Sequence, residues 1–322
     1  MDLIAFFQYL FGYIFSIQAI ILFTILIFIF HIILFLLRDR KDINRVKELE
    51  KIENFPSKDI NEIPLINFVI PAWKEGENLK RCLFLISNLK YPNFKVILNA
   101  GGSEETIEIA NSFKNDARFI ILFQKAGEGK IKAINECLNH ISEGLIYLID
   151  ADILLTDEII HKMLKMLLSK DENLVVSKYR PYKDIESNDL VKYTLLNRLD
   201  VHKDILPKYV PWISANTLMK FNVIKTVKKF SEKRLSDDGL TMGTDITSQG
   251  FKIFYINDLK VQTYYPDNLK IYFSQRSRWI ENALFNALKN NKTKVLKFFL
   301  LTLLSIYIFT CPIWYFFNFY LF

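Results

Sequence analysis

Short apolar runs alternate with helix-length stretches through the middle of the 322-residue chain, and this pattern limits the possible folds more than any other. The apolar runs occupy residues 66–70, 95–98, 119–123, 145–149 and 174–176. The stretches with helical character between them occupy residues 77–89, 104–113, 130–141 and 157–168. Continuous apolar strands that alternate with helices are typical of a parallel sheet covered on both faces. We therefore predict an α/β domain with a mostly parallel sheet.

Polar residues follow each of the first four apolar runs, where ligands bind in sheets of this kind. The four segments are Pro71-Ala72-Trp73-Lys74-Glu75, Asn99-Ala100-Gly101-Gly102-Ser103, Lys125-Ala126-Gly127-Glu128-Gly129-Lys130 and Asp150-Ala151-Asp152. A lysine that follows glycines at the start of a helix, as Lys130 does, suits a phosphate. Taken singly, each segment is explained by a turn, a helix cap or a solvated charge. Together, at one edge of a sheet, they predict a ligand site.

The two aspartates after the fourth run suggest a metal and a diphosphate. Carboxylate oxygens suit Mg²⁺ or Mn²⁺, which bind substrate phosphates through one or two such ligands. Residues two apart in an extended chain point the same way, so Asp150 can meet a nucleotide while Asp152 binds the metal. The structural alternative is a turn that ends the strand and leaves Asp152 in solvent.

A second acidic pair, Asp237-Asp238, follows Ser236 at the start of a predicted helix. A serine N-cap with acids in the first turn stabilises a helix, which is the structural explanation of this pair. The functional explanation makes one of the two acids a general base that deprotonates a hydroxyl. The chain has only four histidines, which argues against zinc, and it offers no serine–histidine or cysteine–histidine motif for a covalent nucleophile.

The segment Gln275-Arg276-Ser277-Arg278-Trp279 is the most specific motif of the chain. On a helix, Gln275, Arg278 and Trp279 share one face. An arginine fork binds a diphosphate with two hydrogen bonds, and a tryptophan face can stack on a sugar ring. The alternative is an interfacial helix with snorkelling arginines and an anchoring tryptophan. Both hold together if an amphipathic helix over residues 268–290 lies on a membrane and closes the site.

Both ends of the chain lack charge over lengths that suit a bilayer. Residues 3–37 contain no charged side chain apart from the titratable His31, and residues 298–322 contain none. Because a spanning helix needs about 20 apolar residues, the first end predicts one span and has room for a second, weaker one. The second end predicts one span with aromatic anchors. A signal peptide is the alternative for the first end, but the run is too long and Asp2 replaces the usual basic start.

Basic residues flank both apolar ends on the side of the central domain: Lys41, Arg45, Lys47, Lys289, Lys292, Lys294 and Lys297. Because Lys and Arg prefer the cytoplasmic side of a span, residues 38–297 are predicted to be cytoplasmic, on an integral protein of the plasma membrane. The net charge of +7 is then explained by a membrane surface, and we expect no nucleic-acid partner. Three cysteines without metal or disulfide spacing fit a reducing compartment.

In this order the motifs resemble the family 2 glycosyltransferases with the GT-A fold, a Rossmann-like α/β fold. The resemblance is to the membrane branch with the cellulose, hyaluronan and chitin synthases and ceramide glucosyltransferase. It rests on residues 68–75, on Gly129-Lys130 with Ala133 and Asn135, on Asp150-Ala151-Asp152, on Asp237-Asp238 and on Gln275 with Arg278-Trp279. It implies a transmembrane segment at 1–37, a linker at 38–63, a GT-A domain at 64–267, an interfacial helix at 268–290 and a transmembrane helix at 298–322.

The resemblance also implies a function and roles by position. Such enzymes are inverting and use Mg²⁺ or Mn²⁺ to move a sugar from a nucleotide-sugar, here a UDP-sugar, to an acceptor. We expect a membrane-associated, lipid-linked or growing glycan acceptor. The implied donor-binding residues are Ala72, Glu75, Asn99, Lys130, Asp150, Gln275 and Arg278. The implied metal ligands are Asp152 and Asp150, the catalytic base is Asp238, and the acceptor residues are Trp279 and Trp212.

Some positions depart from the family pattern and leave other functions open. Asn99 and Ala100 stand where paired aspartates usually read the base, so the nucleotide is not fixed by the motif. A processive polysaccharide synthase is favoured by the last motif and opposed by the few spans. A catalytically silent scaffold would be expected to lack Asp152 or Asp238. A nucleotidyltransferase shares the lysine and aspartate chemistry but would release pyrophosphate and would not require residues 275–279.

Overall fold

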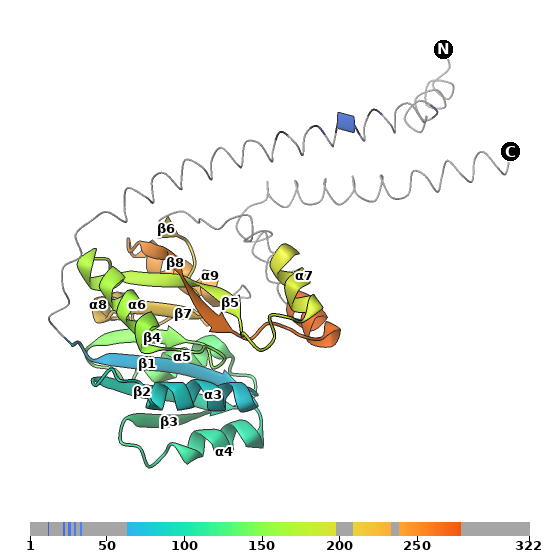
Figure 1. Ribbon diagram of the computed structural model, residues 1–322. Coiled ribbons are helices and arrows are strands. Elements are labelled where there is room, and N and C mark those ends of the chain that lie inside the picture. Colours follow the sequence, from blue (N-terminus) through green and yellow to red (C-terminus); the bar gives the residue numbers. More distant parts are fainter. Residues whose placement is uncertain are drawn as a thin grey trace, which may run out of the picture. The chain divides into compact units, whose positions relative to one another are not determined.

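The computed structural model describes residues 63–197, 209–232 and 238–277, together with six scattered residues near the N-terminus. The chain divides into two compact units, residues 1–54 with 284–322 and residues 55–283. In the first unit the described residues are helical and exposed: Gly12, Leu22, Ile25, Leu26, Ile29 and Ile33. The second unit contains the sheet and all of its described helices (Figure 1).

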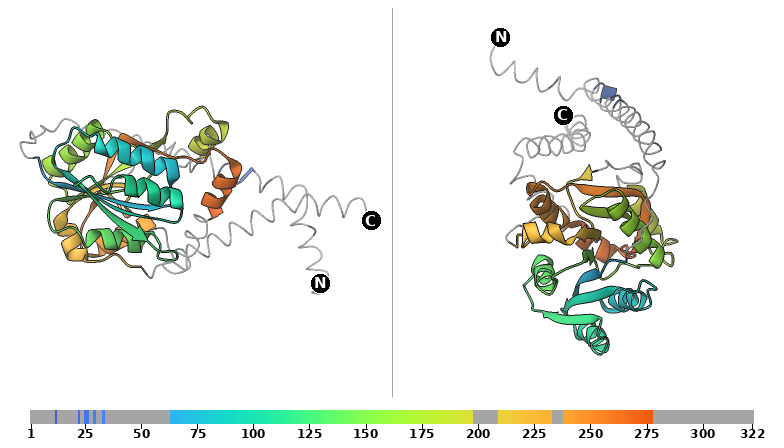
Figure 2. Two further views of the ribbon diagram at one scale, coloured as in Figure 1. Left: turned by 90° about the horizontal axis from the view of Figure 1, so that it is seen from below. Right: turned by 90° about the vertical axis from the view of Figure 1, so that its left-hand side faces the viewer.

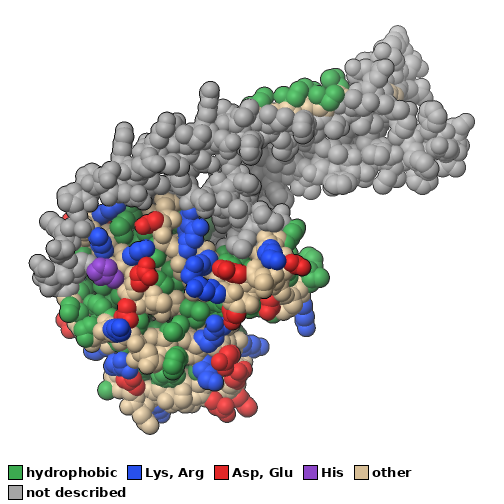
Figure 3. All heavy atoms as spheres, viewed as in Figure 1, with side chains coloured by type: hydrophobic (Ala, Val, Ile, Leu, Met, Phe, Trp, Pro, Cys, Tyr) green, Lys and Arg blue, Asp and Glu red, His purple; other side chains and the backbone are tan. Residues whose placement is uncertain are grey.

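Apart from the six residues named above, the predicted membrane segment at 1–37 lies outside the described residues, as do the segment at 298–322 and nearly all of the linker at 38–63. Within the described ranges, no helix combines the length and hydropathy that a membrane crossing requires. On the face seen in Figure 3, basic and acidic side chains of the described residues are interspersed.

The central sheet of the described residues has eight strands in the order β3-β2-β1-β4-β7-β5-β8-β6. Their bounds are β1 Ile66–Trp73, β2 Phe94–Gly101, β3 Phe119–Gln124, β4 Leu145–Ile149, β5 Leu174–Pro181, β6 Tyr209–Val210, β7 Asn216–Lys220 and β8 Ile253–Thr263. The half from β3 to β4 is parallel, as predicted. The other half is mixed, because β7 pairs antiparallel with both β4 and β5, and β6 with β8. Because β5 and β8 also pair in parallel, four of the seven strand pairs of the described sheet are parallel, and the prediction of a mostly parallel sheet is confirmed.

Seven helices with defined bounds accompany the sheet in the described part of the second unit. They are α3 Gly76–Ser87, α4 Glu104–Ser112, α5 Lys130–Leu138, α6 Asp157–Ser169, α7 Asp189–Asn197, α8 Phe221–Val227 and α9 Asp238–Ser248. The four helices predicted between the strands all form. Ser103 caps α4 by accepting from the backbone N–H of Thr106, and Thr156 caps α6 in the same way.

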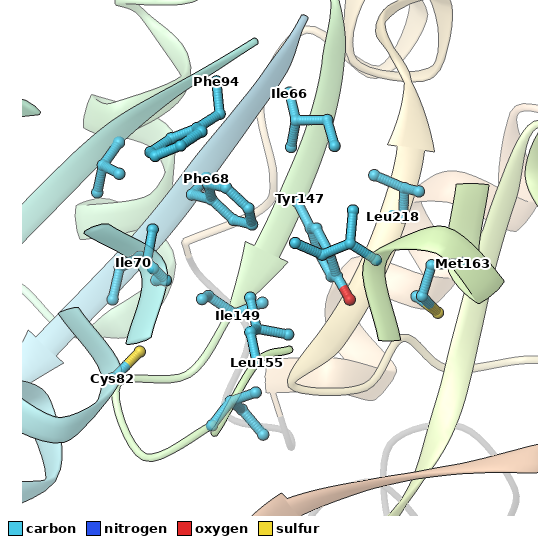
Figure 4. Close-up of a cluster of buried hydrophobic side chains, with 14 of the residues drawn as sticks. Ile66, Phe68, Ile70, Cys82, Phe94, Tyr147, Ile149, Leu155, Met163 and Leu218 are labelled. Carbon is cyan, nitrogen blue, oxygen red and sulfur yellow. The ribbon is translucent and has the colours of Figure 1, made fainter. Parts of the chain in front are cut away.

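Helices flank the two faces of the sheet (Figure 2). An apolar layer lies between the sheet and the helices on each face. On one face Phe68 and Tyr147 stack with ring centroids 5.3 Å apart, and α3 and α6 pack over them (Figure 4). On the other face Val69, which alternates with Phe68 along β1, packs with residues of α5, α8 and α9. The sheet is thus buried on both sides, and its strand ends are left to form a site.

A further helix covers residues 269–277, at the start of the segment predicted to be interfacial. Leu269, Ile271 and Phe273 are exposed on it. Tyr272 packs edge-on against Tyr193 of α7, with ring centroids 6.3 Å apart. The rest of the predicted helix, residues 278–290, lies outside the described residues.

Candidate active site

A pocket of about 810 Å³ opens at the carboxyl ends of β1 and β4. Its walls come from the segment after β1, the start of α5, the loop after β4, residues 212–215, the start of α9 and the segment after β8. These elements are far apart in sequence. The polar residues that follow β1, β3 and β4 therefore meet in one cavity, whereas none of residues 99–103 after β2 is among those that line it.

Seven of the predicted site residues line this pocket: Glu75, Lys130, Asp150, Asp152, Trp212, Asp238 and Gln275. Arg278 and Trp279 lie outside the described residues, so their roles stay predictions. Ala72 and Asn99 are fully buried in β1 and β2 and are not among the lining residues. The Asn99 amide instead donates to Glu136 of α5 at 2.9 Å. The predicted contact of Asn99 with the donor does not fit this arrangement.

The ammonium of Lys130 lies 2.5 Å from Oδ1 of Asp150. Lys130 is the first residue of α5, and it follows Gly129, whose φ of 77° belongs to the left-handed region that glycine tolerates. Burial alone would lower the pKa of Lys130, but the charge of Asp150 and, more weakly, of Asp238 outweighs it and raises that pKa. Lys130 thus stays a cation beside the acidic group, where a phosphate would meet it.

Asp152 is held at both its side chain and its backbone. Its Oδ2 accepts a hydrogen bond of 2.9 Å from the hydroxyl of Thr263, and its carbonyl oxygen accepts one of 2.5 Å from Tyr182. Burial, followed by the charge of Asp150, raises the pKa of Asp152 to about 6. The charge of Asp150 thus opposes the ionisation of Asp152, and a divalent cation beside the two carboxylates would relieve this.

The carboxylate oxygens of Asp150 and Asp152 fit Mg²⁺ or Mn²⁺. Among the described residues, no group of three or more His, Cys, Asp or Glu side chains gathers in a way that could hold an ion alone. These hard cations are commonly held by one or two carboxylates, with substrate phosphates and water completing the shell. Asp150 and Asp152 match that pattern, so water or substrate phosphates would complete the shell of a metal here.

Asp238 opens α9, which docks on the segment that carries Trp212. The backbone N–H of Ile213 donates to the carbonyl of Gly239 at 3.1 Å. At Gly243 the two elements touch so closely that an added Cβ would lie 2.4 Å from the carbonyl oxygen of Pro211. The backbone N–H of Asp150 donates to Ala215 of the same segment at 3.0 Å. Residues 211–215 thus connect the loop that carries Asp150, after β4, to Asp238 at the start of α9.

Trp73 lines the pocket and was not singled out from the sequence. It ends β1 in register with Gly101, and an added Cβ on Gly102 would come within 2.7 Å of its ring. The two glycines therefore let the indole lie against the backbone of β2. An aromatic residue at one strand end, beside paired glycines at the next, is the signal that would have found it.

The sequence model of the family described as "Glycosyltransferase like family 2" matches residues 64–282, which is more than half of the chain. The chain belongs to this family. The match covers every strand of the sheet, so the pocket is that of a family 2 glycosyltransferase domain. The described sheet has the mixed α/β, Rossmann-like architecture of the GT-A fold that the resemblance implied.

Curated relatives and a solved structure agree with this family assignment. The chain is 23% identical over 251 residues to "Probable glycosyltransferase YdaM" of Bacillus subtilis, covering 72% of this chain and 58% of that protein. It is 23% identical over 235 residues to "Poly-beta-1,6-N-acetyl-D-glucosamine synthase" of Staphylococcus aureus, covering 71% of this chain and 57% of that protein. The chain thus spans somewhat over half the length of these relatives.

The mannosyltransferase PcManGT from Pyrobaculum calidifontis, solved in complex with GDP-Man and Mn²⁺, superposes with a TM-score of 0.58. The sequences are 17% identical, and the match covers 81% of this chain and 75% of that one. At this identity the likeness supports the fold of the family 2 domain and nothing about its ligands.

Proposed function

We propose that this chain is an inverting, metal-dependent glycosyltransferase that moves a sugar from a nucleotide-sugar to a membrane-associated acceptor. The observation that carries the proposal is the placement of Asp150, Asp152 and Lys130 in one pocket with Asp238. Inverting transfer needs one site for a departing diphosphate and one base for the acceptor hydroxyl. This pocket offers residues for both.

The donor side is formed by β1, α5 and the loop after β4. Trp73 offers an indole face on which the nucleobase of the donor can stack, and Lys130 offers a charge-assisted hydrogen bond to the diphosphate. Asp150 and Asp152 would hold Mg²⁺ or Mn²⁺, and that ion, when bound, neutralises charge on the leaving nucleoside diphosphate. PcManGT, a protein of the same fold, was solved with GDP-Man and Mn²⁺ bound. A UDP-sugar is the donor that the family resemblance favours.

The acceptor side is formed by α9, residues 212–215 and the segment after β8. Asp238 would take the proton of the acceptor hydroxyl as that oxygen bonds to the anomeric carbon. The bond from that carbon to the diphosphate oxygen breaks at the same time, so the configuration inverts. Gln275 and, by the resemblance, Arg278 would hold the diphosphate, while Trp212 and Trp279 would face the acceptor.

The membrane setting is part of the same proposal. Residues 1–37 and 298–322 would span the bilayer and hold the family 2 domain on the cytoplasmic face. The helix over 268–290 would lie at the interface, and the exposed Leu269, Ile271 and Phe273 on its described part support this. An acceptor that is itself lipid-linked would then reach the pocket from the membrane surface.

A processive polysaccharide synthase is the second candidate. It is favoured by the 23% identity over 235 residues to a protein named poly-beta-1,6-N-acetyl-D-glucosamine synthase. Membranes that contain the full chain, supplied with labelled nucleotide-sugars, would separate the two candidates by product size. A long water-soluble polymer would support the synthase, and a chloroform-soluble product carrying one or a few sugars would support transfer to a lipid.

The catalytic assignment is tested by Asp238→Asn in the full chain. We expect transfer to fall below detection while donor binding stays within about twofold, because the amide cannot accept the hydroxyl proton. Asp258→Asn, at an exposed carboxylate of β8 outside the pocket, is the matched control and should behave as the wild type. Retained turnover in Asp238→Asn would remove Asp238 as the base.

A further inference from the structure

The side chain of Asp152 is held by a residue from the opposite half of the sheet. Thr263 ends β8 and lies 111 residues further along the chain, yet its Oγ1 donates to Oδ2 of Asp152 at 2.9 Å. Thr263 is in register with Pro181, the last residue of β5. Two parallel strands thus end together beside the loop after β4. Neither the family match nor the motifs of the sequence assign a role to this threonine.

The backbone around Asp152 is fixed independently of that hydrogen bond. The N–H of Leu154 donates to the carbonyl of Gln262 at 3.0 Å, in an isolated antiparallel bridge. The hydroxyl of Tyr182 donates to the carbonyl oxygen of Asp152, and the guanidinium of Arg81 lies 4.6 Å above the Tyr182 ring. With the peptide held in this way, rotation about the side-chain bonds is the main freedom left to the carboxylate.

We propose that Thr263 is a positioning residue that fixes the orientation of the Asp152 carboxylate, so that Oδ1 faces the metal and the diphosphate. The inference rests on the proposed function, because it takes Asp152 as the metal ligand. One oxygen that accepts a hydrogen bond from a fixed donor leaves the other to meet a cation. Partners that orient ligating carboxylates typically change metal affinity by about 10–100-fold when removed.

The type of residue at position 263 suits this task. A β-branched side chain in a strand has few accessible rotamers, so the Thr263 hydroxyl has a defined direction. Thr263 also begins the segment that carries Tyr264, Tyr265 and Gln275 into the same pocket. Thr263 therefore connects the Asp152 carboxylate to the segment after β8 that lines the pocket.

The test compares Thr263→Val, which keeps the shape and removes the hydroxyl, with Thr263→Ser, which keeps the hydroxyl. The control is Thr226→Val on α8, whose hydroxyl donates to the carbonyl of Asn222 of its own helix, away from the pocket. Mn²⁺ alone is the probe. Its dissociation constant for the full chain is measured from the electron paramagnetic resonance signal of free Mn²⁺, which requires no turnover.

We expect the Mn²⁺ dissociation constant to rise about tenfold in Thr263→Val and to stay within about twofold in Thr263→Ser and Thr226→Val. Equal affinity in wild type and Thr263→Val would overturn the inference and leave the proposed metal site standing. An equal loss in Thr263→Ser would also overturn it, because the hydroxyl would then not be the cause. A wild type that binds no Mn²⁺ would overturn both the inference and the proposed metal site.

Should Thr263→Val fail to fold by circular dichroism, Thr263→Ala is measured in its place, since a smaller side chain cannot crowd the site. A tenfold weaker Mn²⁺ affinity in folded Thr263→Ala supports the inference, and an unchanged affinity refutes it.

Discussion

Replacing Gly243 with alanine should lower sugar transfer far more than it lowers stability. An added Cβ would lie 2.4 Å from the carbonyl oxygen of Pro211 and 2.6 Å from Cα of Trp212. Even a favourable C–H···O contact keeps carbon and oxygen about 3.3 Å apart, so α9 and the segment 211–215 must separate by roughly 1 Å. Both atoms belong to backbone, so no side-chain rotation relieves the contact.

The two effects of this substitution have different sizes. Overpacking costs about 1–3 kcal/mol, and alanine in a helix recovers about 1 kcal/mol relative to glycine, so the net loss of stability is about 1 kcal/mol. That corresponds to a melting temperature about 2–4 °C lower for a domain of this size. The separation also moves Asp238 away from Trp212, and a misplacement of about 1 Å lowers turnover by about 100-fold.

The assay measures initial rates of transfer and thermal unfolding of the same full-length preparations. Thr244→Ala is the matched control, because it places alanine at the next position of α9, on the exposed side of the helix. It should retain wild-type turnover within about threefold, since only a surface hydroxyl is lost. Wild-type turnover in Gly243→Ala would refute the view that the contact between Gly243 and Pro211 sets the distance between Asp238 and Trp212.

Two further substitutions test the donor side of the pocket. Gly102→Ala should weaken donor binding about tenfold, because the φ of 87° at this position disfavours alanine and the added Cβ would displace the Trp73 ring. Calorimetric titration with the nucleotide measures this, and unchanged binding would contradict a role for Trp73. Lys130→Met should raise the donor KM about 10–100-fold, because it removes one charge-assisted hydrogen bond of about 1.5–3 kcal/mol. A change in kcat alone would instead indicate that Lys130 contacts the leaving group only in the transition state.

The parallel half of the sheet could be predicted because its strands are continuous apolar runs between clear helix signals. Ser103 and Thr156 mark helix starts as N-caps, and Gly129 marks the start of α5. The mixed half could not be predicted in the same way. The short strand β7 gives no strong local pattern, and its place between β4 and β5 depends on pairing with residues that are distant in sequence.

The site residues also differ in whether they could be predicted from the sequence. Asp150, Asp152 and Lys130 follow predicted strands, so their convergence could be expected from topology. Thr263 could not be found, because it ends a strand that the local pattern did not reveal. Asn99 was placed by its position in a motif, but it is fully buried, its amide donates to Glu136 of α5, and it is not among the residues that line the pocket.

The late insertion of β7 also has a consequence for synthesis. The strands β1 to β4 are complete once residue 149 has been made, but the free edge of β4 is paired only by β7, at Asn216–Lys220. At 5–20 residues per second the intervening stretch takes roughly 4–14 seconds to emerge from a ribosome. During that interval an apolar strand has an open edge of the kind that pairs with other chains. The yield of correctly assembled protein would then be governed by β4 while the chain is still growing, rather than by the stability of the finished sheet.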